Sequence, residues 1–530
     1  MFSDINTIIF ILWIFSAISD YSYFVYFFQL KEYRWDRFRD FLSTEQGKHF
    51  TFQFNIVHRA FLIMVALFLP LNIEIQKIVI LAILAINFIH DIHKIFKRKK
   101  FIKPAITLKS LLLISIPILL EVSLLFKSHD WDALLILMMT RIFILGLIVY
   151  AFNLMTDLIK KILINRARKK ISQYKNLKII GITGSYGKTT VKIFLDHILK
   201  SKFNVISTPK HVNTEIGIAK FILKTNFSNT DIFIVEMGAY AEGEIKLICD
   251  MVKPKIGILT AINEQHIALF GNIKKTQKAK YELFRSLPKD GLAITNSDNS
   301  YCREFLNELN CQVMTFGTEE EHKPTILVKS IEKNTEGGKV VVICQNVEIQ
   351  IDSNLRGSHN TMNVLPCTLV ARYLGMTEEE IKGVIKNLPQ TIHIFKYGNC
   401  DIIDDSYNSN PEGFKAALDY ITNFENERKR IVITRGMLEL GEKSNEIHEK
   451  IGGEISYSTD ELVIITPDFV KPLTEGSLSQ KYRLEIKEIF EPVKLLTYIK
   501  NIKNSGSVVL LENRIPELVM KEIRDNSKLI

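Results

Sequence analysis

The sequence is poor in cysteine and has no pair of cysteines at the spacing of a metal site. Its six cysteines lie far apart, with no C-x-x-C pair among them. This spacing argues against a zinc site and against a disulfide framework, and it fits a reducing compartment such as the cytosol. The positions are Cys249, Cys302, Cys311, Cys344, Cys367 and Cys400.

A signal peptide is not expected either. The first apolar stretch has no basic start and no small-residue cleavage site, and further apolar stretches follow it. A chain of 530 residues is too long for one hydrophobic core, so two to four domains are expected. Hydrophobic residues make up 47% of the chain, but they are concentrated before residue 155. This distribution predicts a membrane region joined to a soluble region.

Five apolar segments are expected to form transmembrane helices. Most approach the ~20 residues that a bilayer requires, whereas the second and third are shorter and could form a tight hairpin. Lysine and arginine are abundant after the first, third and fifth segments, which predicts an external N-terminus and a cytosolic soluble region. The same topology accounts for the net charge of +10, so nucleic-acid binding is not expected. The segments are Ile5–Phe28, Asn55–Leu71, Ile75–Ile92, Leu108–Phe126 and Ala133–Leu154.

Glu121 and Arg141 place opposite charges inside the fourth and fifth segments. Both fall in the outer half of the membrane, where an unpaired charge is costly, so they are expected to form an ion pair between the two helices. Contact with a lipid-linked substrate is the alternative interpretation of the same two residues.

The stretch from Lys178 to Thr190 predicts a loop that binds phosphate groups. A short apolar run, typical of a buried strand, leads into a glycine-rich turn and then into a segment with helical spacing. A triphosphate needs small residues with inward N–H groups, a lysine for the outer phosphates, and a hydroxyl for Mg²⁺. The strict G-x-x-x-x-G-K-T spacing is not met, because Ile182 stands five positions before Gly187. The expected ATP-binding residues are Gly184, Ser185, Tyr186, Gly187, Lys188, Thr189 and Thr190.

Short apolar runs alternate with helix-like stretches after Asn176, which predicts a mostly parallel sheet covered by helices. Such sheets bind ligands at the carboxyl ends of their strands. Glu236 and His266 follow two of these runs, and both are candidate ligands for Mg²⁺ beside the triphosphate. Taken singly, a solvated loop histidine is the plainer interpretation of His266. The runs are Ile179–Thr183, Ile232–Met237, Ile256–Thr260 and Ala293–Asn296.

Six further runs, taken with the phosphate loop, resemble the Mur ligases in sequence and in order. They are H-V-N-T-E-I-G (211–217), E-M-G-A-Y-A-E-G-E-I (236–245), K-A-K-Y-E-L-F (278–284), L-R-G-S-H-N-T-M-N-V-L (355–365), D-D-S-Y-N-S-N-P-E-G-F-K-A-A-L (404–418) and G-M-L-E-L-G (436–441). The resemblance is greatest to the MurF branch, whose members add D-alanyl-D-alanine to the cytoplasmic muropeptide precursor. It implies an α-helical membrane region (1–170) followed by α/β domains, namely a P-loop central ATPase domain (171–392) and a Rossmann-like C-terminal domain (393–530).

The resemblance also implies an activity. Mur ligases use ATP and Mg²⁺ to activate a substrate carboxylate as an acyl phosphate, which an amine attacks to give an amide, ADP and phosphate. In this chain the implied catalytic residues are Lys188, Lys280 and His266, and the implied metal-binding residues are Thr189, Glu236, His266 and Lys280.

Several of these roles rest on single positions of the matching runs. Lys280 matches the lysine that the family carbamylates, and a carbamate turns the cation into an anion that can help hold a second Mg²⁺. A solvated basic helix face is the plainer interpretation of Lys278 and Lys280 without the family. The other matches are Asn213 and Thr214 for the substrate-side loop, His359, Asn360 and Asn363 for the adenine-side motif, and Asp404 and Asp405 for the acidic pair near the ribose.

The chain also departs from the family in three places. No arginine stands in the stretch Thr391–Tyr397, shortly before the acidic pair, where the family has an arginine that contacts the ATP phosphates; Lys396 is the candidate replacement. The run Val509–Arg514 stands where the family has Lys-Gly-Ser. The membrane segments stand where MurF proteins have a small domain that grips the uridine nucleotide.

Three functions remain open at this stage. The first is an ATP-dependent amide ligase at the inner face of a bacterial-type cytoplasmic membrane, joining an amino acid or dipeptide to a carboxylate-bearing, lipid-linked envelope precursor. The second is a polymerising ligase similar to the poly-γ-glutamate synthases. The third is a nucleotide-gated membrane protein that makes no bond, and the magnesium and carbamate residues argue against it.

Overall fold

The computed structural model describes most of the chain as two compact units, Met1–Lys161 and Ile162–Ile530. Each unit is described by itself. The described residues are 4–31, 33–42, 47, 50, 64, 73–98, 104–127, 131–263, 270–334, 337–344, 347–353, 355, 358–406, 410–424, 427–438, 440–478 and 484–529.

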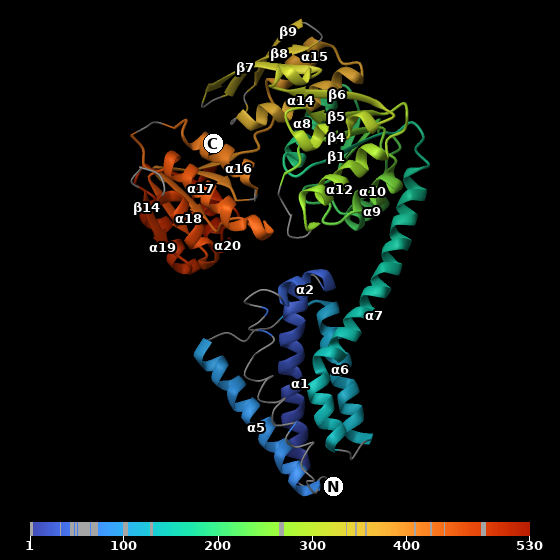
Figure 1. Ribbon diagram of the computed structural model, residues 1–530, viewed down its shortest axis with the longest axis vertical. Helices are drawn as coiled ribbons and strands as arrows, with labels where there is room; N and C mark the ends of the chain where they lie inside the picture. Colours follow the sequence, from blue (N-terminus) through green and yellow to red (C-terminus); the bar gives the residue numbers. More distant parts are fainter. Residues whose placement is uncertain are drawn as a thin grey trace. The chain divides into compact units, whose positions relative to one another are not determined.

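In the described part of the first unit, all regular secondary structure is helical (Figure 1). Three of its helices are long and apolar enough to cross a membrane, over Ile5–Leu30, Leu108–Phe126 and Ile136–Ile171. They confirm the first, fourth and fifth predicted segments as long apolar helices. The third is a helix whose apolar part, Lys77–His90, is shorter, and nearly all of the second lies outside the described residues. The helices are α1 (Asp4–Leu30), α2 (Trp35–Leu42), α5 (Ile73–Arg98), α6 (Leu108–Lys127) and α7 (Trp131–Ile171).

The predicted ion pair between Glu121 and Arg141 is confirmed. The guanidinium of Arg141 donates to both carboxylate oxygens of Glu121, at 3.0 and 2.8 Å, so α6 and α7 are joined by a bidentate pair. Side chains of α1 complete the group: Trp13 and Tyr21 donate to Glu121, and Ser16 and Asp20 accept from Arg141. Both charges are buried and hydrogen-bonded, as a charge within an apolar helical region requires. Together with the α1 side chains, the ion pair joins the helices α1, α6 and α7.

Helix α7 differs from its prediction at the carboxyl end. The apolar segment is predicted to end at Leu154, but the helix continues without a break to Ile171. Its last turns alternate basic and apolar residues, and Ile164, Ala167 and Ile171 are buried among residues of the second unit. These buried contacts stabilise the helix beyond the apolar segment, because most helical stability in proteins comes from packing rather than from propensity.

The second unit begins with a nine-stranded sheet in the order β2-β3-β1-β4-β5-β6-β7-β8-β9 (Figure 1). Its first part is parallel and confirms the four predicted strands, whereas β7, β8 and β9 add two antiparallel pairings that the sequence does not predict. The strands are β1 (Lys178–Thr183), β2 (Val205–Ser207), β3 (Ile232–Glu236), β4 (Ile256–Leu259), β5 (Leu292–Asn296), β6 (Gln312–Gly317), β7 (Ile326–Asn334), β8 (Gly337–Cys344) and β9 (Val347–Ser353).

Helices cover both faces of this sheet. One hydrophobic core lies under α8, α14 and α15, and a second lies under α9, α10 and α12. Strand β1 is buried on both sides from Ile179 onward, so the loop that follows it is anchored in both cores. The helices are α8 (Lys188–Lys200), α9 (Glu215–Lys224), α10 (Glu244–Val252), α12 (Ile273–Arg285), α14 (Ser358–Tyr373) and α15 (Glu378–Ile385).

A second sheet has the order β14-β13-β12-β15-β11-β10-β16. The strands from β14 to β11 are parallel, and helices pack on both faces, as a Rossmann-like domain requires. The strands are β10 (His393–Tyr397), β11 (Cys400–Asp405), β12 (Arg430–Thr434), β13 (Glu461–Ile464), β14 (Glu485–Glu488), β15 (Val508–Glu512) and β16 (Lys528–Leu529). The main helices are α16 (Pro411–Ile421), α17 (Ser444–Ser458), α18 (Val470–Leu478), α19 (Pro492–Ile502) and α20 (Glu517–Asp525).

Candidate active site

The loop between β1 and α8 has the backbone that its glycines predict. Gly184 and Gly187 have φ angles of 148° and 77°, which a residue with a side chain rarely adopts. A Cβ at Gly184 would collide with the hydroxyl of Thr260, and a Cβ at Gly187 would lie 2.7 Å from the Asn363 side-chain oxygen. The hydroxyl of Thr260 donates to the Tyr186 carbonyl. Both glycines are therefore needed for the loop to close against its neighbours.

Lys188 begins α8 and turns back over the loop. Its ammonium donates to the carbonyl oxygens of Gly184, at 2.7 Å, and Ser185, at 3.1 Å. Burial lowers the pKa of Lys188, and the negative charge of Glu236 partly offsets this effect. The positive charge of Lys188 therefore lies at the N-terminus of α8, where anions bind favourably.

Glu236, the last residue of β3, is the centre of a buried polar group. Its carboxylate accepts hydrogen bonds from the Thr189 hydroxyl and the Asn213 amide, each at 3.1 Å, and forms an ion pair with Lys192 at 2.9 Å. Burial by itself raises the pKa of Glu236, but the charge and hydrogen bond of Lys192 outweigh it, so the pKa lies below its usual value. The predicted neighbours Thr189, Asn213 and Glu236 are therefore brought together.

Lys192 is a residue that the sequence interpretation missed. It lies one helical turn beyond Lys188 on α8. Only 4% of the residue is exposed, because its side chain is buried against Glu236. The available signal was the spacing of four residues between the two lysines, which places both on one face of the helix.

Lys280 lies on α12 and points at the same loop. Its Nζ donates to the Gly184 carbonyl at 3.0 Å, the oxygen that also accepts from Lys188. Burial lowers the pKa of Lys280 far below its usual value, and the positive charge of Lys188 lowers it further. The predicted solvated alternative is wrong for Lys280, which is 3% exposed, whereas Lys278 is exposed.

Comparison with known proteins then identifies the family. Residues 182–371 match the Mur ligase middle domain, and residues 392–511 match the Mur ligase glutamate ligase domain. The chain belongs to the Mur ligase family. It is an ATP-dependent ligase that forms C–N bonds, and the matched domains begin after the first unit.

Individual relatives are of the MurF type. The chain is 30% identical over 361 residues to the UDP-N-acetylmuramoyl-tripeptide–D-alanyl-D-alanine ligase of Buchnera aphidicola, covering 67% of this chain and 74% of that protein. It is 27% identical over 348 residues to the ligase of the same name from Bacillus subtilis, covering 65% and 74%. The crystal structure of the Thermotoga maritima MurF ligase with ADP superposes with a TM-score of 0.60 at 24% identity, covering 69% and 84%, and this likeness shows the fold.

The remaining predicted residues of the Mur ligase lie in different surroundings. Asn360 is buried on α14 and accepts from the Thr391 hydroxyl at 3.2 Å, and Asn363 faces Gly187. Thr214 caps α9 by accepting from the Gly217 N–H, which is a structural role. Ser185 accepts from the Asn263 N–H and Thr190 lies in the first turn of α8, whereas His266 and the side chain of His359 lie outside the described residues.

The acidic pair lies at the carboxyl end of β11, where the sequence places it. Asp404 accepts from the N–H and hydroxyl of Ser406, at 3.1 and 2.5 Å. Lys396, the candidate replacement for the missing arginine, instead forms an ion pair with Asp401 at 2.9 Å near the start of the strand. This contact holds Lys396 at the other end of β11, so its phosphate-binding role is not supported.

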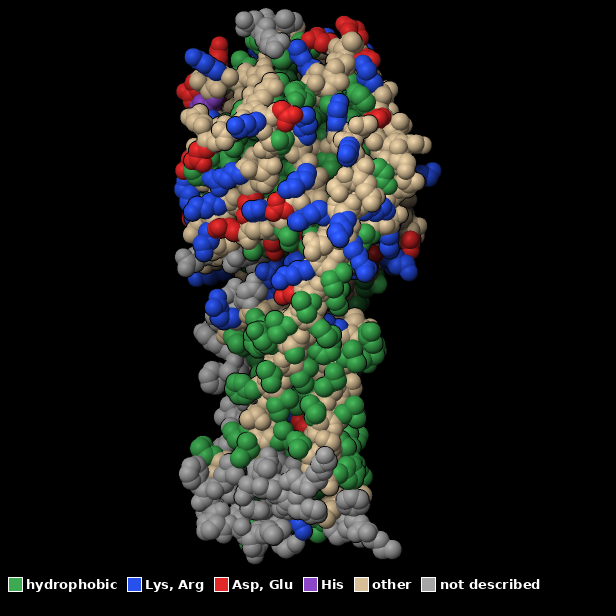
Figure 2. Space-filling model, turned by 90° about the vertical axis from the view of Figure 1, so that its right-hand side faces the viewer, with side chains coloured by type: hydrophobic (Ala, Val, Ile, Leu, Met, Phe, Trp, Pro, Cys, Tyr) green, Lys and Arg blue, Asp and Glu red, His purple; other side chains and the backbone are tan. Residues whose placement is uncertain are grey.

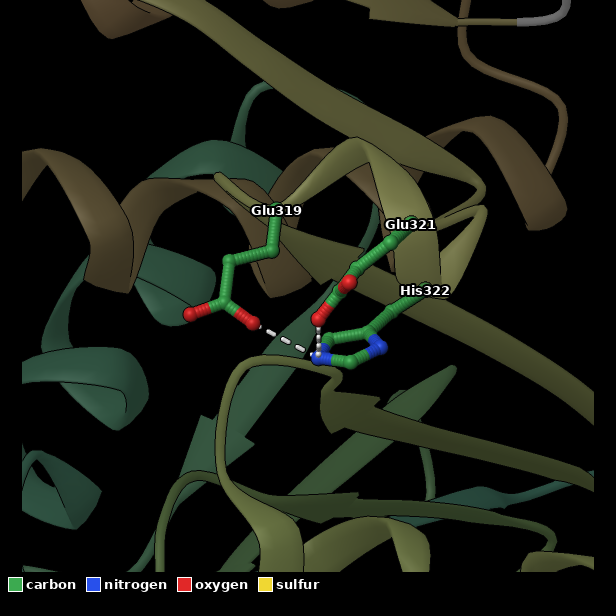
Figure 3. A group of neighbouring side chains, drawn as sticks. All are labelled: Glu319, Glu321 and His322. Carbon is green, nitrogen blue, oxygen red and sulfur yellow. Dashed lines mark ion pairs between the residues drawn. The ribbon is translucent and has the colours of Figure 1, made fainter.

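One further cluster of ionisable side chains lies on the connection between β6 and β7. The imidazole Nε2 of His322 lies 2.6 Å from Glu319 and 3.5 Å from Glu321 (Figure 3). Both glutamates are exposed at the surface, and the histidine nitrogen already pairs with them. We therefore interpret the group as a local ion pair at the surface of the ligase rather than as part of the phosphate-loop site.

Proposed function

We propose that this ligase works at the cytosolic face of a membrane and joins the amine of an amino acid or dipeptide to a membrane-bound, lipid-linked envelope precursor. ATP activates the carboxylate of that precursor as an acyl phosphate. The amine then attacks the acyl carbon, an amide bond forms, and phosphate leaves. The observation that supports the chemistry most directly is the convergence of Lys188 and Lys280 on one carbonyl oxygen.

Two ammonium groups that share one acceptor repel each other. Because Lys280 is buried and Lys188 is needed as a cation for phosphates, we propose that Lys280 is the neutral partner. A neutral amine can add CO₂ to give a carbamate and release one proton. The carbamylated Lys280 would then present an anion beside the phosphate loop, in keeping with the role that the family resemblance implies.

The residues around Glu236 fit a magnesium site. Mg²⁺ prefers oxygen ligands, and the Glu236 carboxylate and Thr189 hydroxyl lie within 3.1 Å of each other at the start of α8. Bound Mg²⁺ would neutralise charge on the transferring phosphate. Lys188 would hold the phosphate oxygens, and Asn213 would fix the orientation of the Glu236 carboxylate.

The surface of the first unit supports a membrane location. Large apolar side chains on α7 face outward, with Phe143 75% and Leu147 70% exposed. Figure 2 shows hydrophobic side chains over much of the visible face of the first unit's helices. Apolar surface of this extent is unfavourable in water and suits a bilayer. The continuous helix α7 then links the last apolar span directly to the ligase unit.

The relatives' names specify a UDP-linked muramoyl tripeptide and D-alanyl-D-alanine as their substrates. For this chain we propose D-alanyl-D-alanine, or a similar amino acid or dipeptide, as the amine. We propose a lipid-linked rather than a soluble acceptor because a tethered enzyme meets membrane-bound substrates at high effective concentration.

Mass spectrometry of reaction products tests this proposal. Full-length protein in lipid nanodiscs would receive ATP, D-alanyl-D-alanine and either UDP-N-acetylmuramoyl-tripeptide or its lipid-linked counterpart. We expect the lipid-linked acceptor to react roughly tenfold faster or more. Equal rates would overturn the lipid-linked acceptor, and repeated additions to one acceptor would indicate the polymerising alternative. Lys188→Ala is the control, because it should abolish ATP turnover.

A further inference from the structure

Two arginines lie at the carboxyl edge of the C-terminal sheet, outside the site described above. Arg435 directly follows β12, and Arg514 follows β15, the neighbouring parallel strand, in which Glu512 pairs with Thr434. The carboxyl ends of parallel strands are where open α/β sheets bind their ligands. The two guanidinium groups therefore share the edge at which a ligand of this domain is expected.

Arg435 lacks the partners that a half-buried guanidinium requires. Its Nε is buried without a hydrogen-bond acceptor, and in the part of the chain that the structure describes neither arginine has an ion pair through its side chain. Burial and then the positive charge of Arg514 lower the pKa of Arg435, while Asp468 partly offsets this. An unmet buried N–H and two adjacent cations are both costly unless an anion joins them.

The backbone that presents Arg514 is held in an unusual conformation. Asn513 and Arg514 have φ angles of 54° and 33°, which residues with side chains seldom adopt. Two hydrogen bonds fix this turn: the Asn513 side-chain amide donates to the Gly436 carbonyl, and the Arg514 backbone N–H donates to the Ser406 carbonyl at 2.7 Å. Strain that is held in place by neighbouring loops is typical of functional sites.

The nearby acidic residues do not neutralise the two arginines. Glu512 is fully buried, neither of its carboxyl oxygens has a hydrogen-bond partner, and burial followed by the charges of Asp405 and Asp404 raises its pKa well above the usual value. Asp468 acts on Arg435 only at longer range, without an ion pair. The edge thus holds separate acidic and basic groups.

We propose that Arg435 and Arg514 form a binding site for an oxyanion, either the free carboxylate of the amine substrate or a phosphate group. The planar guanidinium fork suits both groups, because each offers two oxygens at matching spacing. The carboxylate assignment rests on the proposed ligation, whereas the site itself does not.

Binding to full-length protein, measured without turnover by calorimetry, tests the site. The probes are D-alanyl-D-alanine, its C-terminal amide and inorganic phosphate. If the site takes a carboxylate, the dipeptide should bind roughly tenfold or more tighter than its amide, and Arg435→Met or Arg514→Met should remove this preference. If it takes a phosphate, the same variants should weaken phosphate binding and leave the dipeptide unaffected.

Controls separate the site from general effects. Arg524→Met removes an exposed arginine that pairs with Glu517 on α20, and it should leave all three affinities unchanged. Arg435→Lys keeps the charge without the fork and should bind weakly, which covers the case in which Arg435→Met fails to fold. Unchanged binding of both dipeptide and phosphate by the folded Arg435 and Arg514 variants would overturn the proposal. Normal binding without any ligation would instead count against the proposed function alone.

Discussion

Lys192 forms a buried ion pair with Glu236 across 2.9 Å, one helical turn beyond the lysine of the phosphate loop. The pair determines the charge of the carboxylate that we assign to Mg²⁺, because Lys192 is the main reason that the pKa of Glu236 is low despite its burial. It also joins α8 to β3, so it fixes the position of the phosphate loop relative to the end of the strand. Its removal should therefore affect both stability and metal binding.

Lys192→Met should destabilise the ligase unit by about 3–5 kcal/mol, since it leaves a buried carboxylate without its cation. Lys200→Met, which removes an exposed pair with Asp196 on the same helix, should cost less than about 1 kcal/mol. Thermal unfolding of the full-length variants measures both. Equal destabilisation by the two substitutions would show that the buried pair has no special importance.

The same ion pair predicts that the stability of the ligase unit falls in acid. The folded pKa of Glu236 is lowered, so the pair stabilises fully above the unfolded value, and this stability is lost as pH falls through the folded pKa. The melting temperature of the wild-type protein should therefore drop more than that of Lys192→Met as pH falls below about 4.5, the ordinary pKa of a glutamate side chain. Parallel pH curves for the two proteins would contradict this assignment.

Lys280→Ala should lose most ligation, because no carbamate can form at its position beside Gly184. Added formate or acetate should restore part of the activity by supplying a carboxylate there. Lys278→Ala is the matched control, since Lys278 lies exposed on the same helix and should behave as wild type. Full activity of Lys280→Ala, measured as phosphate release in the presence of both substrates, would rule out the carbamate.

Glu512→Gln should stabilise the C-terminal domain at neutral and alkaline pH. Burial, and then the charges of Asp405 and Asp404, raise the pKa of Glu512 well above its usual value. Such a group supports stability below its unfolded pKa, and this support is lost as pH rises through the folded pKa. The wild-type protein should thus lose melting temperature on alkalinisation, and the variant should lose less. A melting curve for Glu512→Gln that falls as steeply as that of the wild type would contradict this.

Local patterns were enough to predict much of this molecule. The phosphate loop and the strands that lead to Glu236 depend on neighbouring residues, so spacing and periodicity reveal them. The partner of Lys192 lies 44 positions away in the sequence, and the surroundings of Arg435 are built by the loops after β11 and β15. No local pattern encodes such contacts. Strands β7 to β9 were missed for a related reason, because their antiparallel pairings interrupt the alternation of strands and helices.

Helix α7 gives the last prediction, because its final turns belong to the ligase unit. Ile164, Ala167 and Ile171 are buried in the core beneath α9, and Lys170 donates to the Leu223 carbonyl at 2.9 Å. A fragment starting at residue 162 keeps these contacts, whereas one starting at residue 172 loses two large apolar side chains from the core.

Truncation of each buried isoleucine costs about 2–5 kcal/mol, so the shorter fragment should melt at a clearly lower temperature or fail to fold. The longer fragment should retain ATP binding, measured by calorimetry, and yet lose most ligation on a membrane-bound acceptor, because it lacks the apolar spans. Two fragments of equal stability would show that the end of α7 is only a linker. A longer fragment as active as the full-length protein on lipid-linked acceptor would show that the membrane spans do not serve to bring the enzyme to its substrate.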